Sequence, residues 1–387
     1  MKINTAFIYS EHFQDYKFSN EHPFNQLRVQ LTYDLLNELN AFSPEHIISP
    51  RIASDKEIGL IHESNYINAV KLAGIGNLPL ETALNYGLGT EDTPIFPNMH
   101  EASSLIVGGT LNAVEMVMEG KANHALNLGG GLHHGFTGKA SGFCIYNDSS
   151  IAIKYILEKY RKRVLYIDTD VHHGDGVQWA FYDCDKACTL SIHETGRYLF
   201  PGTGNVSERG SGEGYGYSFN IPVDAFTEDE SWLDIYRTSL KEITEFFKPD
   251  VILTQNGSDG HYYDPLSHLY LTTKVYREIP KIAHEIAHKY TDGKWIAVGG
   301  GGYDIWRVVP RAWAFIWLEM NDISHLGYGK LPEKWIEKWQ QKSPATLPET
   351  WDDIENLYEP VPRKAEITEK NKQTLDKALF AIRNNKS

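Results

Sequence analysis

The sequence VLYIDTDVHHGDG, residues Val164–Gly176, is an apolar run that leads directly into acidic and histidine side chains. Alternate side chains of an extended strand share a face, so Asp168, Asp170 and His172 leave the strand end pointing the same way. Burying two carboxylates and an imidazole together is costly without a cation, and this set suits a divalent metal ion. The alternative is a solvated Asp/His loop, which the apolar residues before it disfavour. The stretch therefore predicts a buried strand that ends at a metal site.

Similar apolar runs alternate with segments of helical period along most of the chain. The predicted strands are Ala6–Tyr9, Ala125–Leu128, Val164–Asp168, Ala187–Ile192, Val251–Thr254 and Trp295–Val298. The predicted helices are Pro23–Leu39, His100–Glu119, Tyr146–Lys159, Ser231–Phe247, Thr272–Tyr290 and Val308–Met320. Such alternation predicts an α/β fold: one domain with a central, mainly parallel sheet, helices on both faces and the active site in loops at the carboxyl ends of the strands.

The composition changes from about Lys330 onward. We expect a catalytic domain over residues 1–325 and a C-terminal extension of mixed loop and helix over residues 326–387. The segment Lys342–Lys372 is rich in Pro, Glu and Lys, and it predicts a surface extension that ends in a short helix, Gln373–Arg383.

Composition and charge exclude several classes of protein. With 41% hydrophobic residues the chain can bury a sizeable core, and its net charge of −14 argues against binding to nucleic acid or to an anionic membrane. The same charge fits a cationic substrate. Three cysteines, Cys144, Cys184 and Cys188, make no disulfide framework, and no apolar stretch is long enough to span a bilayer. We therefore expect a cytoplasmic protein with no leader segment.

A second motif is NLGGGLHHG, residues Asn127–Gly135, in which two adjacent histidines follow a glycine turn. Histidine is the commonest general base, and a buried carboxylate can fix its tautomer. Asp168 and Asp175 are candidate partners for His133 and His134. Taken alone, the pair could equally be structural or surface histidines; next to the Asp/His stretch it indicates catalysis.

Two further strands end in polar turns. VILTQNGSDGH, residues Val251–His261, contains Asp259, which could complete a three-ligand zinc site that keeps one position open, although a turn aspartate is the alternative. Gly299–Gly302 lets the backbone approach a neighbour closely, and Tyr303 then projects a hydrogen-bond donor. A phosphate-binding loop is the alternative for these glycines, but the G-x-x-x-x-G-K-[ST] pattern is missing.

Together these motifs resemble the histone deacetylase superfamily, over roughly Phe7 to Met320. The segments that carry the resemblance are EHPFNQLR (Glu21–Arg28), IHESNY (Ile61–Tyr66), GGLHH (Gly130–His134), SGFC (Ser141–Cys144), DTDVHHGDG (Asp168–Gly176), FPGTG (Phe200–Gly204) and GGGGY (Gly299–Tyr303). An ordered set of this kind is highly specific. The resemblance implies the arginase/deacetylase fold and hydrolysis of N6-acetyl-lysine in proteins.

The resemblance also implies roles for individual residues. Asp170, His172 and Asp259 match the ligands of one Zn²⁺ per chain, and Tyr303 matches a tyrosine that binds the substrate carbonyl. His133 and His134 match two active-site histidines, paired with Asp168 and Asp175; His134 would take a proton from water. Residues that match the substrate tunnel or the channel below it are Phe143, Phe200, Gly142, Gly301, Asp92 (with Glu91 as an alternative at the rim) and Arg28. Potassium is implied at Asp168, Asp170, His172, Ser191 and Ile192, and at a second site formed by Phe181, Cys184, Ala187 and Tyr217.

Three other functions compete with this prediction. An arginase-type ureohydrolase needs two manganese ions and an Asp-x-Asp pair, where this chain has Asp259-Gly260-His261. An acetylpolyamine hydrolase carries a long loop insertion, and Gly74–Pro97 shows none. A non-catalytic acetyl-lysine reader would not need His133, His134 and Tyr303 together. The resemblance extends to a bacterial branch of the superfamily in acetoin and acetate metabolism, which implies an acetylated protein as partner, with acetyl-CoA synthetase as the candidate. The sequence does not indicate an oligomeric state.

Overall fold

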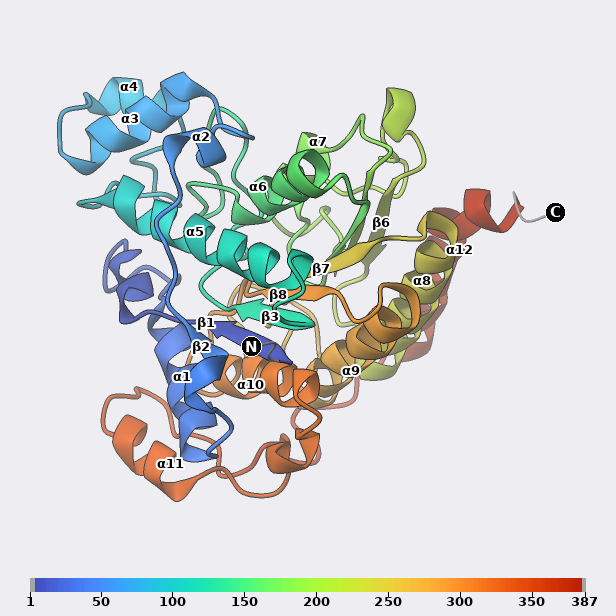
Figure 1. Cartoon of the computed structure of the whole chain (residues 1–387). Coiled ribbons are helices and arrows are strands. Elements are labelled where there is room, and N and C mark those ends of the chain that lie inside the picture. Colours follow the sequence, from blue (N-terminus) through green and yellow to red (C-terminus); the bar gives the residue numbers. More distant parts are fainter. Residues whose placement is uncertain (1–3, 385–387) are drawn as a thin grey trace.

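A computed structural model describes residues 4–384 and is organised around one eight-stranded sheet (Figure 1). The strand order is β2-β1-β3-β8-β7-β4-β5-β6, and each neighbouring pair is parallel. The strands are β1 (Thr5–Ile8), β2 (Ile47–Ile48), β3 (His124–Asn127), β4 (Val164–Asp168), β5 (Ala187–Glu194), β6 (Ser218–Val223), β7 (Val251–Gln255) and β8 (Trp295–Val298). The predicted single parallel-sheet domain is confirmed.

The central strands are buried along their whole length, which explains their continuous apolar character. Their register brings the carboxyl ends to one edge of the sheet. Asp168 at the end of β4 lies opposite Gln255 in β7 and Ser191 in β5, and Gln255 in turn lies opposite Val298 in β8. The loops that leave β3, β8, β7 and β4 therefore start side by side.

Helices cover both faces of the sheet (Figure 1). On one face α5 contacts β1 and β3 and packs against α6, while on the other α1, α10, α9 and α8 form a row in which neighbours touch. Helix α12 continues this row and covers the edge strand β6. The helices are α1 (Leu27–Glu38), α2 (Asp55–Ile58), α3 (Ser64–Gly74), α4 (Leu80–Asn85), α5 (Met99–Met118), α6 (Asp148–Tyr155), α7 (Asp175–Ala180), α8 (Asp229–Phe247), α9 (Thr273–Tyr290), α10 (Val309–Met320), α11 (Glu333–Gln340) and α12 (Lys364–Asn384).

Each strand and long helix predicted before residue 325 is present, with ends that shift by one to a few residues. Apart from the 11-residue helix α3, the elements that sequence patterns missed are short or lie at an edge of the sheet. Strand β6 has the sequence SFNIPV, and its Asn220 and Pro222 hide the strand pattern. Proline is tolerated there because β6 is an edge strand that does not need every backbone N–H for pairing.

The predicted surface extension, Lys342–Lys372, is wrong in one respect, because Trp351 within it is buried. Trp335 and Trp339 of the preceding helix α11 are buried as well, and the Trp335 indole N–H donates to the backbone carbonyl of Leu31 in α1 at 2.9 Å. The final helix is also longer than predicted, Lys364–Asn384 in place of Gln373–Arg383, since its polar first turns lack an apolar stripe. The predicted domain boundary at residue 325 stays a prediction. The outer ends of the two predicted regions, residues 1–3 and 385–387, lie outside the described residues.

Two predictions about the cellular environment can be compared with the structure. Between residues 4 and 384, every helix is too short or too polar to cross a bilayer. Cys144, Cys184 and Cys188 are free thiols, as the lack of a disulfide framework predicted.

Candidate active site

The four motif-bearing loops meet at the carboxyl edge of the sheet. The loop after β4 carries Asp170 and His172, and the loop after β7 carries Asp259. The turn after β3 leads to His133 and His134. Strands β4 and β7 are neighbours in the sheet and β8 separates β7 from β3, so the side chains of His172 and Asp259, 87 residues apart in the sequence, come into contact.

Asp170, His172 and Asp259 form a compact buried cluster. The Nδ1 atom of His172 lies 3.2 Å from Oδ1 of Asp170 and 3.1 Å from Oδ2 of Asp259. The three candidate ligand atoms lie within 4.8 Å of one another, and the residues are 1%, 7% and 0% exposed in chain order. Burial lowers the pKa of His172, but hydrogen bonds to the two carboxylates outweigh this and raise it to about 10. Two carboxylates thus converge on a single imidazole. A divalent cation would neutralise the negative charge of the two carboxylates.

Hydrogen bonds from residues outside the three-residue cluster orient each carboxylate. Oδ2 of Asp170 accepts from the Gln255 side-chain amide at 2.8 Å and from the Gly301 N–H at 2.6 Å. Oδ1 of Asp259 accepts from the Val171 N–H at 2.9 Å. The second oxygen of each carboxylate is therefore turned toward His172. Any side chain at Gly301 would collide with the Asp259 carboxylate, so the close approach requires glycine there. This donor set fits a divalent metal ion held by two oxygens and one nitrogen.

The two adjacent histidines are held by two different carboxylates. Nδ1 of His133 lies 2.8 Å from Oδ2 of Asp168, and Nδ1 of His134 lies 2.7 Å from Oδ1 of Asp175. Their Nε2 atoms are 3.0 Å apart, and the Tyr166 hydroxyl donates to Asp168 at 2.8 Å. Both predicted His–Asp pairs are therefore present in the structure.

The same surroundings shift the two pKa values in opposite directions. Burial lowers the pKa of His133, but the charges of Asp168 and Asp170 overcome this and raise it to about 9. Burial together with the positive charge of His133 lowers the pKa of His134 to about 4, although Asp175 opposes the shift. At neutral pH His133 is thus a cation and His134 is neutral. A neutral imidazole is the form that accepts a proton, so the geometry favours His134 as a general base.

A cavity of about 230 Å³ leads to these side chains. Ring centroids are 5.1 Å apart for Phe200 and His134, and 5.7 Å apart for Phe143 and Tyr303. The residues that line the cavity are Asp92, His134, Gly142, Phe143, His172, Leu199, Phe200, Leu266 and Tyr303. A Cβ at Gly142, whose φ is +49°, would come 2.9 Å from the Phe200 ring and 2.5 Å from the His134 ring, so a side chain there would narrow the passage.

Most of the predicted tunnel residues thus lie on this cavity; Gly301 is not among its lining residues and lies instead against the Asp259 carboxylate. At the rim, Asp92 and not Glu91 is among the lining residues. Burial and the charges of Asp259 and Asp170 raise the pKa of Tyr303 well above 10, so its hydroxyl stays protonated and can donate. Arg28 is buried below the site, where it donates from Nη1 to the Gly302 carbonyl at 2.9 Å and packs between Phe24 and Trp313.

The residues predicted to bind potassium lie next to the carboxylate cluster. Ser191 pairs with Asp168 across β4 and β5, with Ile192 following in β5. Two members of the second predicted set are in contact, because the Cys184 N–H donates to the Phe181 carbonyl at 3.1 Å. The Tyr217 carbonyl accepts from the N–H of Thr189, which follows Ala187 by two residues in β5, at 2.9 Å. Potassium at either position stays a prediction.

Two supporting residues were missed by the sequence reasoning. Asp148 is fully buried and accepts from the backbone N–H groups of Gly131 and Leu132, at 3.1 and 2.8 Å, which fixes the turn before His133. Gln255 holds Asp170 through its amide and accepts from the Gly257 N–H through its other end. The sequence offered one signal for each residue. Gln255 is a polar residue at the end of an apolar strand, and Asp148 is an acidic residue at the start of a helix.

Comparisons with known proteins agree with this geometry. A sequence model of the family described as Histone deacetylase domain matches residues 22–320. The chain is 65% identical over 380 residues to the "Acetoin utilization protein AcuC" of Bacillus subtilis (strain 168), covering 98% of each chain. It is 48% identical over 379 residues to the protein of the same name from Staphylococcus xylosus, again covering 98% of each.

Solved structures show the same fold. A crystal structure of an HDAC homologue complexed with SAHA aligns with a TM-score of 0.84 and 32% identity, covering 96% of this chain and 100% of that one. The HDAC homologue from Aquifex aeolicus aligns with a TM-score of 0.83 and 31% identity over the same shares of the two chains.

Proposed function

The chain belongs to the histone deacetylase family, and on that premise we propose that it hydrolyses the acetyl amide of N6-acetyl-lysine in proteins. Family membership supports a deacetylase, and the name of the relatives supports a role in acetoin utilization. One observation carries the substrate proposal: a narrow cavity with aromatic walls ends at a buried Asp-His-Asp cluster beside two histidines that are each paired with a carboxylate.

The cavity matches the chemistry of an acetylated lysine side chain. The methylene stem is apolar, and acetylation removes the charge of the nitrogen, so aromatic walls at Phe143 and Phe200 would bind the stem by apolar contact. The carboxylate of Asp92 lies on the same cavity and would accept hydrogen bonds from backbone N–H groups of a bound peptide.

We propose that Asp170, His172 and Asp259 hold one Zn²⁺ per chain, because carboxylate oxygen and imidazole nitrogen both bind zinc and three protein ligands leave its fourth position open. When bound, the ion would act as a Lewis acid toward the acetyl carbonyl and make the attacking water more acidic. We extend the proposal to K⁺ beside Asp168, Asp170, His172, Ser191 and Ile192, where the β4–β5 register places oxygen donors close together.

The chain's own residues would carry the proton transfers. Neutral His134 takes a proton from the attacking water, whose oxygen adds to the carbonyl carbon. Cationic His133, held against Asp168, lies next to His134 and stabilises the negative charge that develops. The carbon–nitrogen bond then breaks, and the histidine pair returns a proton to the lysine nitrogen, so that acetate and a free lysine amine are released.

Tyr303→Phe is expected to lower kcat by about 10²–10³ while leaving KM within a few-fold, because a hydroxyl that donates to the oxyanion acts mainly in the transition state. The Tyr303 ring packs on Phe143, and phenylalanine keeps this contact. The check is steady-state kinetics on an acetyl-lysine peptide. Tyr358→Phe, which removes a hydroxyl away from the cavity, serves as the matched control. An unchanged kcat in the Tyr303 variant would remove this residue from the mechanism.

The proposed substrate is tested by comparing an acetyl-lysine peptide with N-acetylputrescine, the substrate type of the rival acetylpolyamine hydrolases. We expect kcat/KM for the peptide to be at least about tenfold higher, because Asp92 at the cavity can bind a peptide backbone that the polyamine lacks. Asp92→Asn should reduce this preference mainly through KM. Faster hydrolysis of N-acetylputrescine would assign the protein to the polyamine class, and hydrolysis of neither would reject the deacetylase proposal.

The remaining proposals concern the cellular setting. We propose that the physiological partner is an acetylated protein, with acetyl-CoA synthetase as the first candidate because the relatives are named for acetoin utilization. The free thiols of the three cysteines fit a cytoplasmic location. The net charge of −14 disfavours nucleic acid and anionic membranes as partners and favours basic segments around the acetylated lysine.

A further inference from the structure

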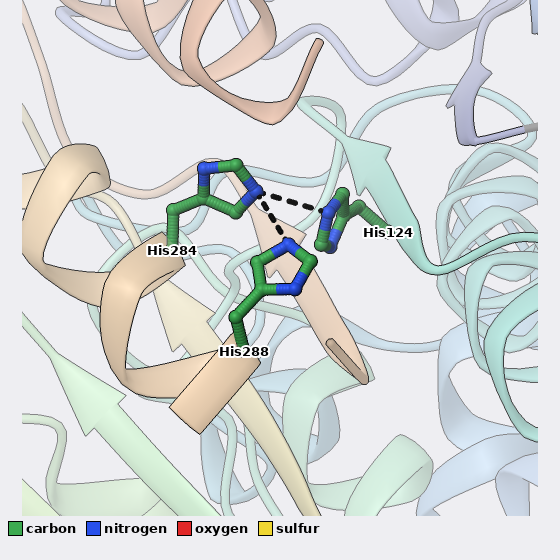
Figure 2. A group of neighbouring side chains, drawn as sticks. All are labelled: His124, His284 and His288. Carbon is green, nitrogen blue, oxygen red and sulfur yellow. Dashed lines mark hydrogen bonds between the residues drawn. The ribbon is translucent and has the colours of Figure 1, made fainter. Parts of the chain in front are cut away.

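A second cluster of potential metal ligands lies at the opposite edge of the sheet from the active site. His124 is the first residue of β3, whereas His133 and His134 follow the last residue of that strand. His284 and His288 lie one turn apart in α9 and so share a face of that helix. Figure 2 shows the three rings turned toward one another, with His284 making contact with both of the others.

The spacing of the three rings is close to that of a coordinated set. Nε2 of His284 lies 3.1 Å from Nε2 of His124 and 2.9 Å from Nε2 of His288, and the three atoms lie within 4.8 Å of one another. Tetrahedral zinc with bonds of about 2.05 Å separates neighbouring ligand nitrogens by about 3.3 Å. Two of the three separations are therefore within a few tenths of an ångström of those in a tetrahedral zinc site.

The environment of His284 selects the nitrogen that faces the cluster. Its Nδ1 lies 3.5 Å from Oε1 of Glu319, whose other oxygen accepts from the Ser324 hydroxyl at 2.5 Å. An ionised carboxylate favours the proton on Nδ1 and leaves the lone pair on Nε2, which is the arrangement found for metal-bound histidines.

A purely hydrogen-bonded trio explains these contacts less well. The single lone pair on Nε2 of His284 faces two other Nε2 atoms, and it cannot accept two full hydrogen bonds. A metal ion would use all three lone pairs at once. Access also differs within the cluster: His124 and His284 are buried, while His288 is exposed, which gives an ion a route from solvent and leaves a coordination position for water.

We propose that His124, His284 and His288 bind one Zn²⁺ at a site separate from the catalytic one. Three neutral imidazoles suit zinc among the borderline divalent metals, and Glu319 supplies the supporting carboxylate. Such an ion would join the start of β3 to the end of α9, two segments 160 residues apart in the chain. Its effect would be structural, since the loops that carry the catalytic side chains lie at the other edge of the sheet.

Metal content measures the proposal directly. After loading with ZnCl₂ and gel filtration, we expect two equivalents of zinc in the wild-type chain by mass spectrometry, one in His288→Ala and one in Asp259→Asn. The double variant should hold none. His12→Ala removes an exposed histidine that belongs to neither cluster and should retain both ions, as the matched control. Equal zinc content in wild type and His288→Ala, or loss of the second equivalent on gel filtration, would overturn the proposal.

Thermal unfolding supplies a second measurement that does not depend on activity. In the Asp259→Asn background, zinc at a hundredfold excess over its Kd should raise Tm by about 3 °C, because the ion binds only the folded chain. Adding His288→Ala should remove this rise, and because His288 is exposed, the variant is expected to fold. The same rise in both proteins would show that zinc stabilises the chain elsewhere.

Discussion

Asp259→Asn is expected to lower the catalytic metal content by one equivalent and kcat/KM for an acetyl-lysine peptide by at least about 10³-fold. A metal ion supplies several kcal/mol of transition-state stabilisation, and each ~1.4 kcal/mol corresponds to a factor of ten. Oδ2 of Asp259 lies 3.1 Å from Nδ1 of His172 in a fully buried position. Asparagine keeps the shape and can still accept from the Val171 N–H, but it lacks the negative charge that the ion requires.

Removing the metal from the wild-type chain should have the same effect. A chelator is expected to abolish turnover while far-ultraviolet circular dichroism stays largely unchanged, since the buried sheet does not depend on the ion. Zinc should restore activity to the wild type and not to Asp259→Asn. Asp15→Asn, at an exposed position, is the matched control. Full activity of the chelated protein, or normal zinc content and turnover in Asp259→Asn, would contradict the assignment of the metal ligands.

His134→Ala is expected to lower kcat by about 10²–10⁴, with zinc content unchanged, because general-base catalysis contributes a factor of this size. His134 is positioned by Asp175 at 2.7 Å and by the neighbouring His133 at 3.0 Å, and its pKa near 4 keeps it neutral at pH 7. It is not among the three clustered ligands, so its loss separates proton transfer from metal binding.

The comparison for this variant is His12→Ala, which removes a histidine with an exposed side chain. His133→Ala should also be impaired, since the cationic partner next to His134 is lost. Near wild-type turnover in His134→Ala would show that another group accepts the proton from water. Loss of zinc from this variant would show instead that the substitution disturbs the metal cluster.

Much of this site could be predicted because its functional residues occur in short sequence patterns. Asp168, Asp170 and His172 alternate after an apolar strand, and the period of two predicts their common face. The parallel sheet then brings the end of β7, with Asp259, next to that face. The same edge of the sheet also receives the turn after β3, which carries His133 and His134. This explains why their pairing with Asp168 and Asp175 could be predicted.

The supporting residues could not be predicted in this way. Gln255 and Asp148 act as single polar side chains inside the core, and no periodicity distinguishes them from other buried polar residues. The packing of Trp335 on Leu31 joins segments 304 residues apart, which no local pattern records. The His284–His288 spacing is visible in the sequence, but only the fold shows that His124 meets the same helix face.

The most direct test of the account is hydrolysis of an acetyl-lysine peptide in water enriched in ¹⁸O by the zinc-loaded protein. The account predicts one acetate and one free lysine per turnover, with a single solvent oxygen atom in each acetate, and loss of this product in Asp259→Asn. Acetate without solvent oxygen, transfer of the acetyl group to another acceptor, or no release of acetate by the metal-loaded protein would contradict it.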